Sequence, residues 1–523
     1  MTRLTAVPDP KQAAQKGSAF DCVLLVGPDP GACDLPALRD ALRAAAAVDR
    51  GFGARAALWP APAAAGGRLV TAPTGPLDRD HDDVRRYADA AAKGARIARD
   101  AGATKVLLLV QPAAAGRKGG DDRYAEAAPV AVRGALAALW QPLEAREAHG
   151  QKDLEPVAQL GIAALDGSFD KRAAALEQAL DDGIRLARDL CGADPERMAP
   201  QRFAQHVQQA LRGTGVKVTV VSTPTVLKKD YPLLSAVARA SMPVARHRPC
   251  VIRLEYGGKT AKRTLLFAGK GVTYDTGGAD LKVGGHMAGM MRDKGGAAAV
   301  AGLVLAAARL KLPGVRVVAE LGMVRNSIGS DAYVADEIIR SHGGARVRVG
   351  NTDAEGRMVL ADLLSHLRVR AQQEKAPHLF TIATLTGHAV RAVGPYSIAL
   401  DNGPARAAGM AETLAAAGDR HGDPFEVSRL RREDWDFVQP GSRADDVLQC
   451  NSAPSSATAR GHQFPMAFLC IAAGMTEHGG DGKKPLCYTH LDIAGSADAG
   501  GDASMGTAPG RPVAALLHAL LRS

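Results

Sequence analysis

The sequence predicts an α/β protein of two domains, a smaller α/β N-terminal domain and a larger α/β domain whose mostly parallel sheet is flanked by helices. The length of 523 residues exceeds what a single hydrophobic core usually organises. Hydrophobic residues make up 46% of the chain and charged residues 23%, which is typical of a folded globular protein. Short apolar runs bounded by turn-forming residues alternate with helical patterns, as expected for helices covering a sheet.

In the first part of the chain, Cys22–Gly27 and Lys105–Val110 are predicted to be buried strands, because each is a short run of leucine and β-branched residues. Apolar residues then recur at helical spacing over Lys171–Cys191, and the stretch that follows contains the Gly, Asp and Pro residues that end helices. We therefore place a domain junction near residue 180. The expected domains are residues 1–180 and residues 181–523.

Beyond this junction, strand-like and helix-like segments alternate, as in an open α/β sheet. The predicted strands are Val251–Tyr256, Thr264–Ala268, Val315–Met323, Arg346–Val349 and Leu379–Leu385. The predicted helices are Gly296–Arg309, Asp331–Ser341 and Met358–Ala371.

Charge and cysteine usage exclude several classes of function. The net charge is +10, but basic and acidic residues are interleaved and aromatics are only 4%, so a nucleic-acid partner is not expected. The seven cysteines are scattered and never spaced as CxxC, which favours a reducing compartment. Neither a signal peptide nor a membrane span is expected, so we predict a cytoplasmic protein.

The first polar segment whose residue types suit catalysis or ligand binding runs from Lys270 to Lys282 and includes Asp275. It follows a predicted strand, so its side chains should emerge at the carboxyl end of the sheet, where open α/β sheets bind ligands. Asp293 comes next, just before a glycine- and alanine-rich stretch that would let a helix pack closely on the sheet.

The second segment is Asn351–Arg357, in which Asp353, Glu355 and Arg357 are alternate residues. In extended backbone all three side chains would point to one side. Two carboxylates on one side repel each other unless a proton or cation intervenes, and hard oxygen ligands suit divalent metals. Taken alone, however, such a DxE is more often a solvated turn, and a lone Lys270 would be a surface lysine. The glycines fit neither GxGxxG nor a P-loop, so phosphate binding is not indicated.

Together these segments resemble the signature blocks of the M17 leucyl aminopeptidases, the cytosol aminopeptidase family. The family pattern NTDAEGR stands letter for letter at Asn351–Arg357. Further similarity runs from Arg185–Cys191 through Thr384–Gly387 to His490–Gly495, which covers the C-terminal two thirds of the chain.

The resemblance implies a two-metal aminopeptidase, usually a homohexamer, that acts on peptides with a free N-terminus. The implied metal ligands are Lys270, Asp275, Asp293, Asp353 and Glu355. The ions would be Zn²⁺ or Mn²⁺, with Mg²⁺ or Co²⁺ as alternatives, and would activate a shared water. Lys282 and Arg357 would be the catalytic cations, with bicarbonate held beside Arg357. Substrate would contact Met290, Thr384, Leu385 and Gly387.

The chain also departs from the usual family pattern. Most members carry methionine where Lys294 stands and an ENMP-type segment where Val324–Gly329 stands. His388 replaces a usual alanine; we expect it to form a structural hydrogen bond, with substrate contact as the alternative. We expect structural roles also for His286, His462 and His490. The blocks Tyr274–Asp280, Met287–Met290, Arg292–Lys294 and Thr386–His388 look closer to a divergent branch of aminopeptidases.

Two classes of function stay open at this point. One is an active aminopeptidase that favours leucine-like N-terminal residues. Measuring its activity after chelation and metal add-back would test this function. The other is a non-catalytic family member that binds DNA or serves as a scaffold. A DNA-binding protein should show salt-sensitive affinity for duplex DNA. A protein without catalysis is not expected to keep all seven charged residues, so the sequence favours the enzyme.

Overall fold

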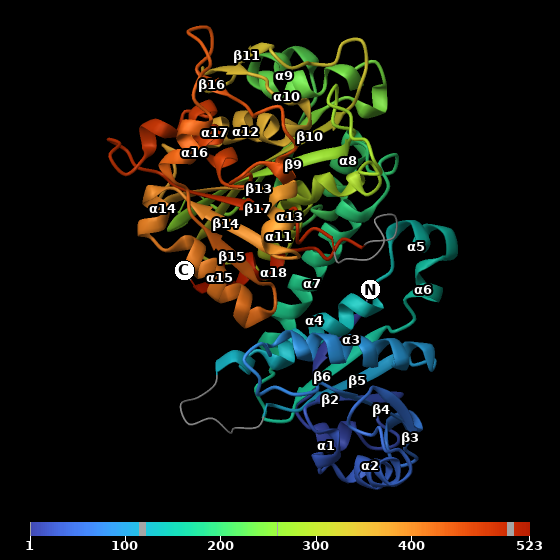
Figure 1. Ribbon diagram of the computed structural model, residues 1–523. Helices are drawn as coiled ribbons and strands as arrows, with labels where there is room; N and C mark the ends of the chain where they lie inside the picture. The colour runs from blue at the N-terminus through green and yellow to red at the C-terminus, as the bar shows by residue number, and fades with distance from the viewer. Residues whose placement is uncertain (1, 114–121, 259, 499–506, 523) are drawn as a thin grey trace. The chain divides into compact units, whose positions relative to one another are not determined.

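The computed structural model describes residues 2–113, 122–258, 260–498 and 507–522 (Figure 1). Contacts within the chain define two compact units. The first comprises Met1–Asp181 together with Gly418–Asp423, and the second comprises Asp182–Ala417 and Pro424–Ser523. The boundary at residues 181 and 182 falls inside a long helix, α7 (Lys171–Gly192).

The first unit contains a six-stranded sheet with the order β1-β6-β5-β2-β4-β3. All neighbouring strands are parallel except the β3–β4 pair, which is antiparallel. The predicted strands Cys22–Gly27 and Lys105–Val110 are confirmed as β2 and β5 in the middle of this sheet. The other strands are β1 (Arg3–Ala6), β3 (Ala57–Pro60), β4 (Arg68–Pro73) and β6 (Gln159–Ala164).

Helices cover both faces of this sheet (Figure 1). On one face α3 (Arg85–Asp100) packs against α4 (Ala127–Leu139), and α2 (Pro36–Val48) lies on the other. The contact between α3 and α4 is close because a Cβ on Gly134 would stand 2.2 Å from the carbonyl oxygen of Ala88. Short helices complete the unit: α1 (Pro10–Ala13), α5 (Leu143–His149) and α6 (Gln151–Leu154).

The second unit is built on an eight-stranded sheet with the order β15-β14-β17-β13-β9-β10-β8-β7. The central strands β17, β13, β9 and β10 are mutually parallel. Three pairs are antiparallel, namely β8 with β10, β7 with β8 and β14 with β17. Its strands are β7 (Lys217–Val221), β8 (Cys250–Tyr256), β9 (Arg263–Asp275), β10 (Val315–Asn326), β13 (Pro377–Ala383), β14 (Ser397–Asp401), β15 (Phe425–Ser428) and β17 (Cys487–Asp492). The predicted α/β class with a mostly parallel, helix-flanked sheet is confirmed.

Two long helices sandwich the centre of this sheet. On one face lies α11 (Gly295–Leu310) with α18 (Val513–Arg522), and on the other α12 (Glu355–Ala371) with α17 (Phe464–Ala472) (Figure 1). Gly296 lets α11 approach the sheet, since a Cβ there would lie 2.0 Å from the carbonyl oxygen of Ile382. The remaining helices are α8 (Pro200–Ala210), α9 (Pro224–Asp230), α10 (Pro232–Val237), α13 (Gly387–Val393), α14 (Gly403–Ala407), α15 (Met410–His421) and α16 (Arg432–Phe437).

One predicted helix is wrong. Asp331–Ser341 forms turns and then the short strand β11 (Ile338–Arg340), which pairs with β12 (Arg346–Arg348) in a small sheet completed by β16 (Val447–Leu448). Asp336 has a φ of 73°, which breaks a right-handed helix. Pairing with the neighbouring strand thus outweighs the helical spacing of apolar residues in this segment.

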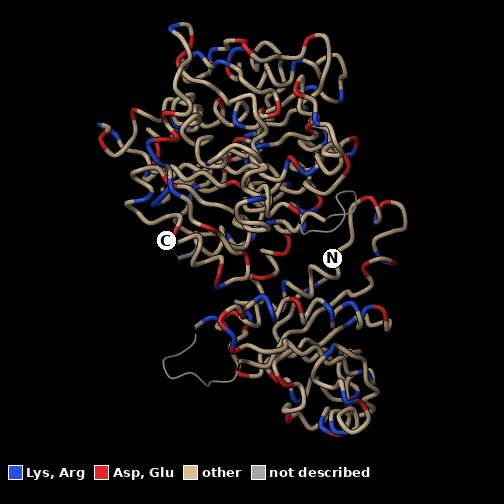
Figure 2. The backbone as a smooth tube through the Cα atoms, in the orientation of Figure 1, with Lys and Arg blue, Asp and Glu red and all other residues tan. Residues whose placement is uncertain are grey.

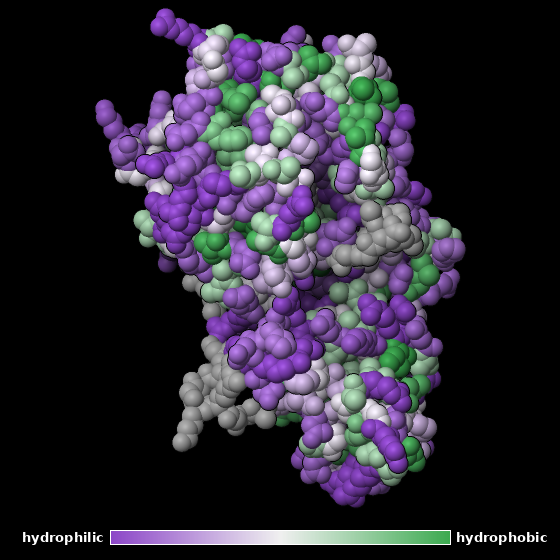
Figure 3. Space-filling view, viewed as in Figure 1, coloured by the Kyte–Doolittle hydropathy of each residue, from purple (hydrophilic) through white to green (hydrophobic). Residues whose placement is uncertain are grey.

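The surface carries intermixed charges and apolar groups. Lys and Arg alternate with Asp and Glu along the backbone trace (Figure 2), and the face in Figure 3 mixes hydrophilic with hydrophobic residues. All seven cysteines are free thiols. Within the described part of the chain, no helix has both the length and the apolar character needed to cross a bilayer.

Candidate metal centre

The centre of the eight-stranded sheet carries the first two candidate ligands. Lys270 and Asp275 both belong to β9, which lies between β10 and β13. We predicted that these residues follow the end of a strand, but β9 continues through Asp275, because its pairing with β10 persists to Asn326. Both side chains are buried, with 3% of each residue exposed.

The NTDAEGR segment also differs from the extended conformation predicted for it. Thr352–Ala354 form a 3-10 turn, and Glu355 is the first residue of α12. The turn begins at Asn351, whose side-chain oxygen accepts a hydrogen bond from the Asp353 amide at 2.8 Å. Glu355 is consequently almost fully buried at 1% exposed, whereas the side chain of Asp353 is 35% exposed.

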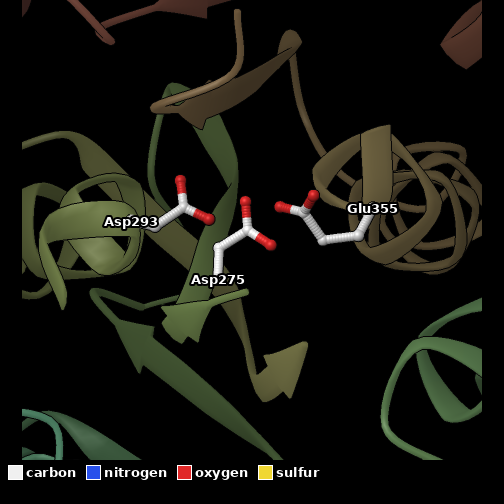
Figure 4. A group of neighbouring side chains, drawn as sticks. All are labelled: Asp275, Asp293 and Glu355. Carbon is white, nitrogen blue, oxygen red and sulfur yellow. The ribbon is translucent and has the colours of Figure 1, made fainter. Parts of the chain in front are cut away.

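Three carboxylates converge in this region. Asp275 comes from β9, Asp293 from the turn Met290–Lys294 that precedes α11, and Glu355 from the start of α12. One oxygen of each lies within 4.8 Å of the others, and Figure 4 shows the three carboxylates pointing toward one another. The cluster is therefore held by one strand of the eight-stranded sheet and by the starts of two helices that pack on that sheet.

Lys270 lies inside this cluster. Its Nζ is 2.7 Å from Asp293 Oδ1 and 2.9 Å from Glu355 Oε1, and it donates to the carbonyl oxygen of Thr384 at 2.7 Å. Burial alone would lower the pKa of Lys270, but the neighbouring carboxylates raise it. Burial raises the pKa of Asp293 well above its ordinary value, and the charge of Lys270 only partly offsets this. The Lys270 ammonium therefore offsets part of the negative charge of the cluster.

A second lysine, Lys282, contacts the other side of the site. Its Nζ lies 2.9 Å from Asp275 Oδ2 and forms a short ion pair with Asp353. Burial would lower the pKa of Lys282, but Asp275 and Asp353 raise it. Burial and the charge of Asp275 raise the pKa of Asp353 to about 7. The predicted ligands and the predicted catalytic lysine therefore do lie together.

The donor set fits divalent cations. Asp293 Oδ2 and Glu355 Oε1 are buried and accept no hydrogen bond from any described residue, although Lys270 lies close to Glu355 Oε1. Buried carboxylate oxygens without hydrogen bonds are costly unless a cation balances them. Carboxylate oxygens are hard ligands that suit such ions, and a neutral lysine amine can join them.

Polar neighbours that the sequence did not single out orient the ligands. Asn326 Nδ2 donates to Asp275 Oδ1 at 2.8 Å, and the Gly277 amide donates to the same oxygen at 2.9 Å. Asn326 and Tyr333 both donate to the carbonyl oxygen of Thr352, at 3.1 and 2.8 Å. Asn326 lies in Val324–Gly329, the segment that departs from the usual family pattern. Its position at the end of β10 is the feature that could have indicated its role.

Gln449 holds the turn that carries Asp353. Its Oε1 accepts from the amides of Gly350 and Asn351 at 3.0 Å, and its Nε2 donates to the carbonyl oxygens of Asn351 and Ala354. Arg357 donates to the carbonyl oxygen of Gln449 at 2.9 Å and lies over the ring of Phe464. Arg357 is 1% exposed, so it is a buried cation next to the ligand segment.

The segment after β13 lies against the cluster. Thr384 Oγ1 donates to Asp293 Oδ1 at 2.8 Å, in addition to accepting from Lys270 through its carbonyl oxygen. Asp492, at the end of β17, accepts from the Leu385 amide at 3.1 Å and from Thr386 Oγ1 at 2.6 Å. Thr384, Leu385 and Met290 are partly exposed and Gly387 is exposed beside this segment.

The singled-out histidines have different environments. His388 Nδ1 lies 2.9 Å from His462 Nδ1, so its partner is another histidine rather than a carbonyl. His490 is buried and contacts Thr381 Oγ1 at 2.7 Å. Burial lowers the pKa of His462 to about 4 and that of His490 to about 3. His286 is exposed.

Fold and site together define an α/β protein with a buried cluster of carboxylates able to hold divalent cations. Residues 185–517 match the catalytic domain of the cytosol aminopeptidase family, Peptidase_M17. The chain belongs to this family of peptide hydrolases, so the predicted membership is confirmed.

Individual relatives agree with this assignment. A putative aminopeptidase of Caenorhabditis elegans is 42% identical over 488 residues, which cover 91% of each chain. A probable cytosol aminopeptidase of Leifsonia xyli subsp. xyli is 31% identical over 516 residues, covering 98% of this chain and 96% of the relative. The solved structure of the bottromycin maturation enzyme BotP in complex with Mn is similar with a TM-score of 0.74 and 27% identity, covering 96% of this chain and 99% of BotP.

Proposed function

We propose that this chain is a two-metal aminopeptidase of the cytoplasm that removes leucine-like N-terminal residues from peptides. The observation that carries the proposal is the convergence of the buried carboxylates of Asp275, Asp293 and Glu355 within 4.8 Å of one another. Lys270 lies among these carboxylates, and Asp353 lies next to them through Lys282. We assign the five ligand roles to Lys270, Asp275, Asp293, Asp353 and Glu355.

The proposed mechanism assigns separate tasks to the residues of the site. Two bound divalent ions would lower the pKa of a shared water and polarise the scissile carbonyl. Lys282, held between Asp275 and Asp353, would donate hydrogen bonds to the oxyanion that develops on that carbonyl. Lys270 would serve as a neutral amine, because nearby divalent charges disfavour its ammonium form.

Arg357 would bind bicarbonate and assist the transfer of a proton to the leaving amine. Its buried Nε has no hydrogen-bond partner among the described residues, which supports an acceptor at this position. Met290, Thr384, Leu385 and Gly387 would line the space for substrate, and an apolar, adaptable Met290 suits leucine-like side chains. We further propose a homohexamer, which light scattering of the purified protein tests.

Hydrolysis of leucyl-aminomethylcoumarin after chelation and metal add-back tests the proposed function. Mn²⁺ is the first ion to add, because the structural relative BotP was solved with Mn; Zn²⁺, Mg²⁺ and Co²⁺ follow. We expect chelation to abolish hydrolysis and two ions per chain to restore it. Full activity in chelator, with no bound divalent metal, would contradict the proposal.

A further inference from the structure

We propose that His388 and Arg391, both on α13, form a subsite that binds the C-terminal carboxylate of short peptides. This inference rests on the proposed function and specifies its substrates as di- and tripeptides.

The path of the chain connects this subsite to the metal centre. Thr384 contacts both Lys270 and Asp293, and His388 follows only four residues later. Four residues span at most about 14 Å, and a di- or tripeptide in extended form spans roughly 7–11 Å. His388 therefore lies no more than about 14 Å from Thr384, a separation that an extended di- or tripeptide spans together with the length of the Arg391 side chain. The intervening backbone is fixed, because Leu385 and Thr386 both bind Asp492.

The ring of His388 is held by a chain of hydrogen bonds from neighbouring elements. Gln463 Nε2 donates to Ser428 Oγ at 3.1 Å, Ser428 Oγ lies 2.9 Å from His462 Nε2, and His462 Nδ1 lies 2.9 Å from His388 Nδ1. The Ser428 oxygen accepts from Gln463, which leaves its hydroxyl hydrogen to donate to His462 Nε2; in this arrangement His462 Nδ1 donates to His388. Nδ1 of His388 then accepts, and its Nε2 carries the hydrogen.

The free side of His388 is suited to an anion. Its Nε2 has no hydrogen-bond partner among the described residues, and the ring is only partly covered. Burial and the charge of Arg460 lower the pKa of His388, which favours the neutral ring. A neutral ring with a fixed Nε2–H donates a directed hydrogen bond to a carboxylate oxygen.

Arg391 supplies the charge. It lies three residues after His388 in α13, and residues at this spacing are neighbours on one side of a helix. Arg391 is exposed and has no acidic partner in the described part of the chain, whereas Arg460 is already paired with Asp434 at 2.7 Å. A guanidinium can bind a carboxylate through two parallel hydrogen bonds.

Kinetics with a peptide and its C-terminal amide test the subsite. KM and kcat of the Mn²⁺-loaded protein are measured for Leu-Gly and for Leu-Gly-amide, which lacks the carboxylate. We expect wild type to have a lower KM for Leu-Gly. Arg391→Ala should raise that KM about tenfold at constant kcat and leave the amide unaffected, and His388→Ala should act in the same direction.

Arg406 is an exposed arginine of α14, and Arg406→Ala serves as the matched control. This variant should leave KM and kcat unchanged for both substrates. Equal KM values of wild type for the two substrates would overturn the subsite, and so would an Arg391→Ala variant that affects both substrates alike or neither. Wild type that hydrolyses neither substrate would instead refute the proposed function. Arg391 is exposed, so its replacement leaves the test valid even if His388→Ala fails to fold.

Discussion

Gly356 lies directly against the side chain of Lys270. A Cβ on Gly356 would stand 2.7 Å from Nζ, and equally close to Cδ and Cε. Lys270 is 3% exposed and surrounded by carboxylates, so its side chain has no open space into which it can move. The glycine of NTDAEGR, in the first turn of α12, thus leaves room for a side chain from strand β9.

The first prediction is that Gly356→Ala weakens metal binding. The added methyl group displaces Lys270 Nζ, and changes next to metal ligands typically cost about 10–100-fold in affinity. Helix formation is not the expected cause, because alanine is the better helix former. Titration with Mn²⁺ measures the effect. The matched control is Gly403→Ala at the start of α14, where the nearest atom would be 3.6 Å from the new Cβ. Equal Mn²⁺ affinity in both variants would contradict the prediction.

Lys282→Ala should separate catalysis from metal binding. Lys282 neutralises Asp275 and Asp353, so its removal leaves both carboxylates available and should not reduce the metal content. Loss of one group that stabilises an oxyanion costs on the order of 10²–10³ in turnover, or about 3–4 kcal/mol. Steady-state kinetics combined with elemental analysis measures both quantities. Turnover near that of wild type, or loss of a metal ion, would show that the assigned role is wrong.

Local sequence patterns predicted the buried strands of the sheets well. Cys22–Gly27 and Lys105–Val110 have the predicted ends, because each contains a buried apolar run bounded by turn-forming residues. The helix predicted for Asp331–Ser341 was wrong, because the structure of this segment depends on pairing with β12, which local spacing does not encode. β9 extends past its predicted end for a similar reason, since the pairing with β10 holds it.

The candidate site was predictable as a set of residues but not in its geometry. Asp353 and Glu355 were expected on one side of an extended segment, whereas a 3-10 turn and the start of α12 bring them into the site. The supporting contacts of Gln449 and Asp492 join segments about a hundred residues apart, so no local motif reveals them. The short segment Gly418–Asp423, which belongs to the first unit, was also beyond prediction.

Buried histidines predict how stability changes with pH. Burial lowers the pKa of His378 to about 3, whereas a histidine of the unfolded chain has a pKa of about 6.5. Below pH 6.5 the unfolded chain therefore binds a proton that the folded chain does not, so the free energy of unfolding falls between about pH 6.5 and 3. The slope reaches about 1.4 kcal/mol per pH unit for one such group.

Replacing His378 by Gln should make the free energy of unfolding fall less steeply with decreasing pH, by the contribution of about one bound proton. Gln keeps a donor for Thr489 Oγ1, which lies 2.9 Å from His378 Nε2, but it does not titrate. Urea unfolding at several values between pH 7 and pH 4 measures the slope. The control is His286→Gln, whose exposed side chain should leave the slope unchanged. An identical slope in His378→Gln and wild type would rule out this source of acid sensitivity.

The last prediction concerns the free amine of the substrate. In the proposed mechanism a neutral α-amine binds one of the metal ions, and an N-acetyl group removes the lone pair that this bond requires. The acetyl group also adds bulk where the peptide should end, next to buried residues such as Asp293 and Glu355. We therefore expect Leu-Gly-Gly to be cleaved after its first residue and N-acetyl-Leu-Gly-Gly to be refused, whatever the affinity for its side chain.

Chromatography of the products at matched concentrations shows which bond breaks in each peptide. The blocked peptide should stay intact while the free peptide releases leucine. The two peptides differ only in the amine, so a difference between the two reactions reports on the role of the amine. Comparable cleavage of both peptides, or cuts inside longer ones, would show that the amine is not the anchor and would point to an endopeptidase or another amidohydrolase.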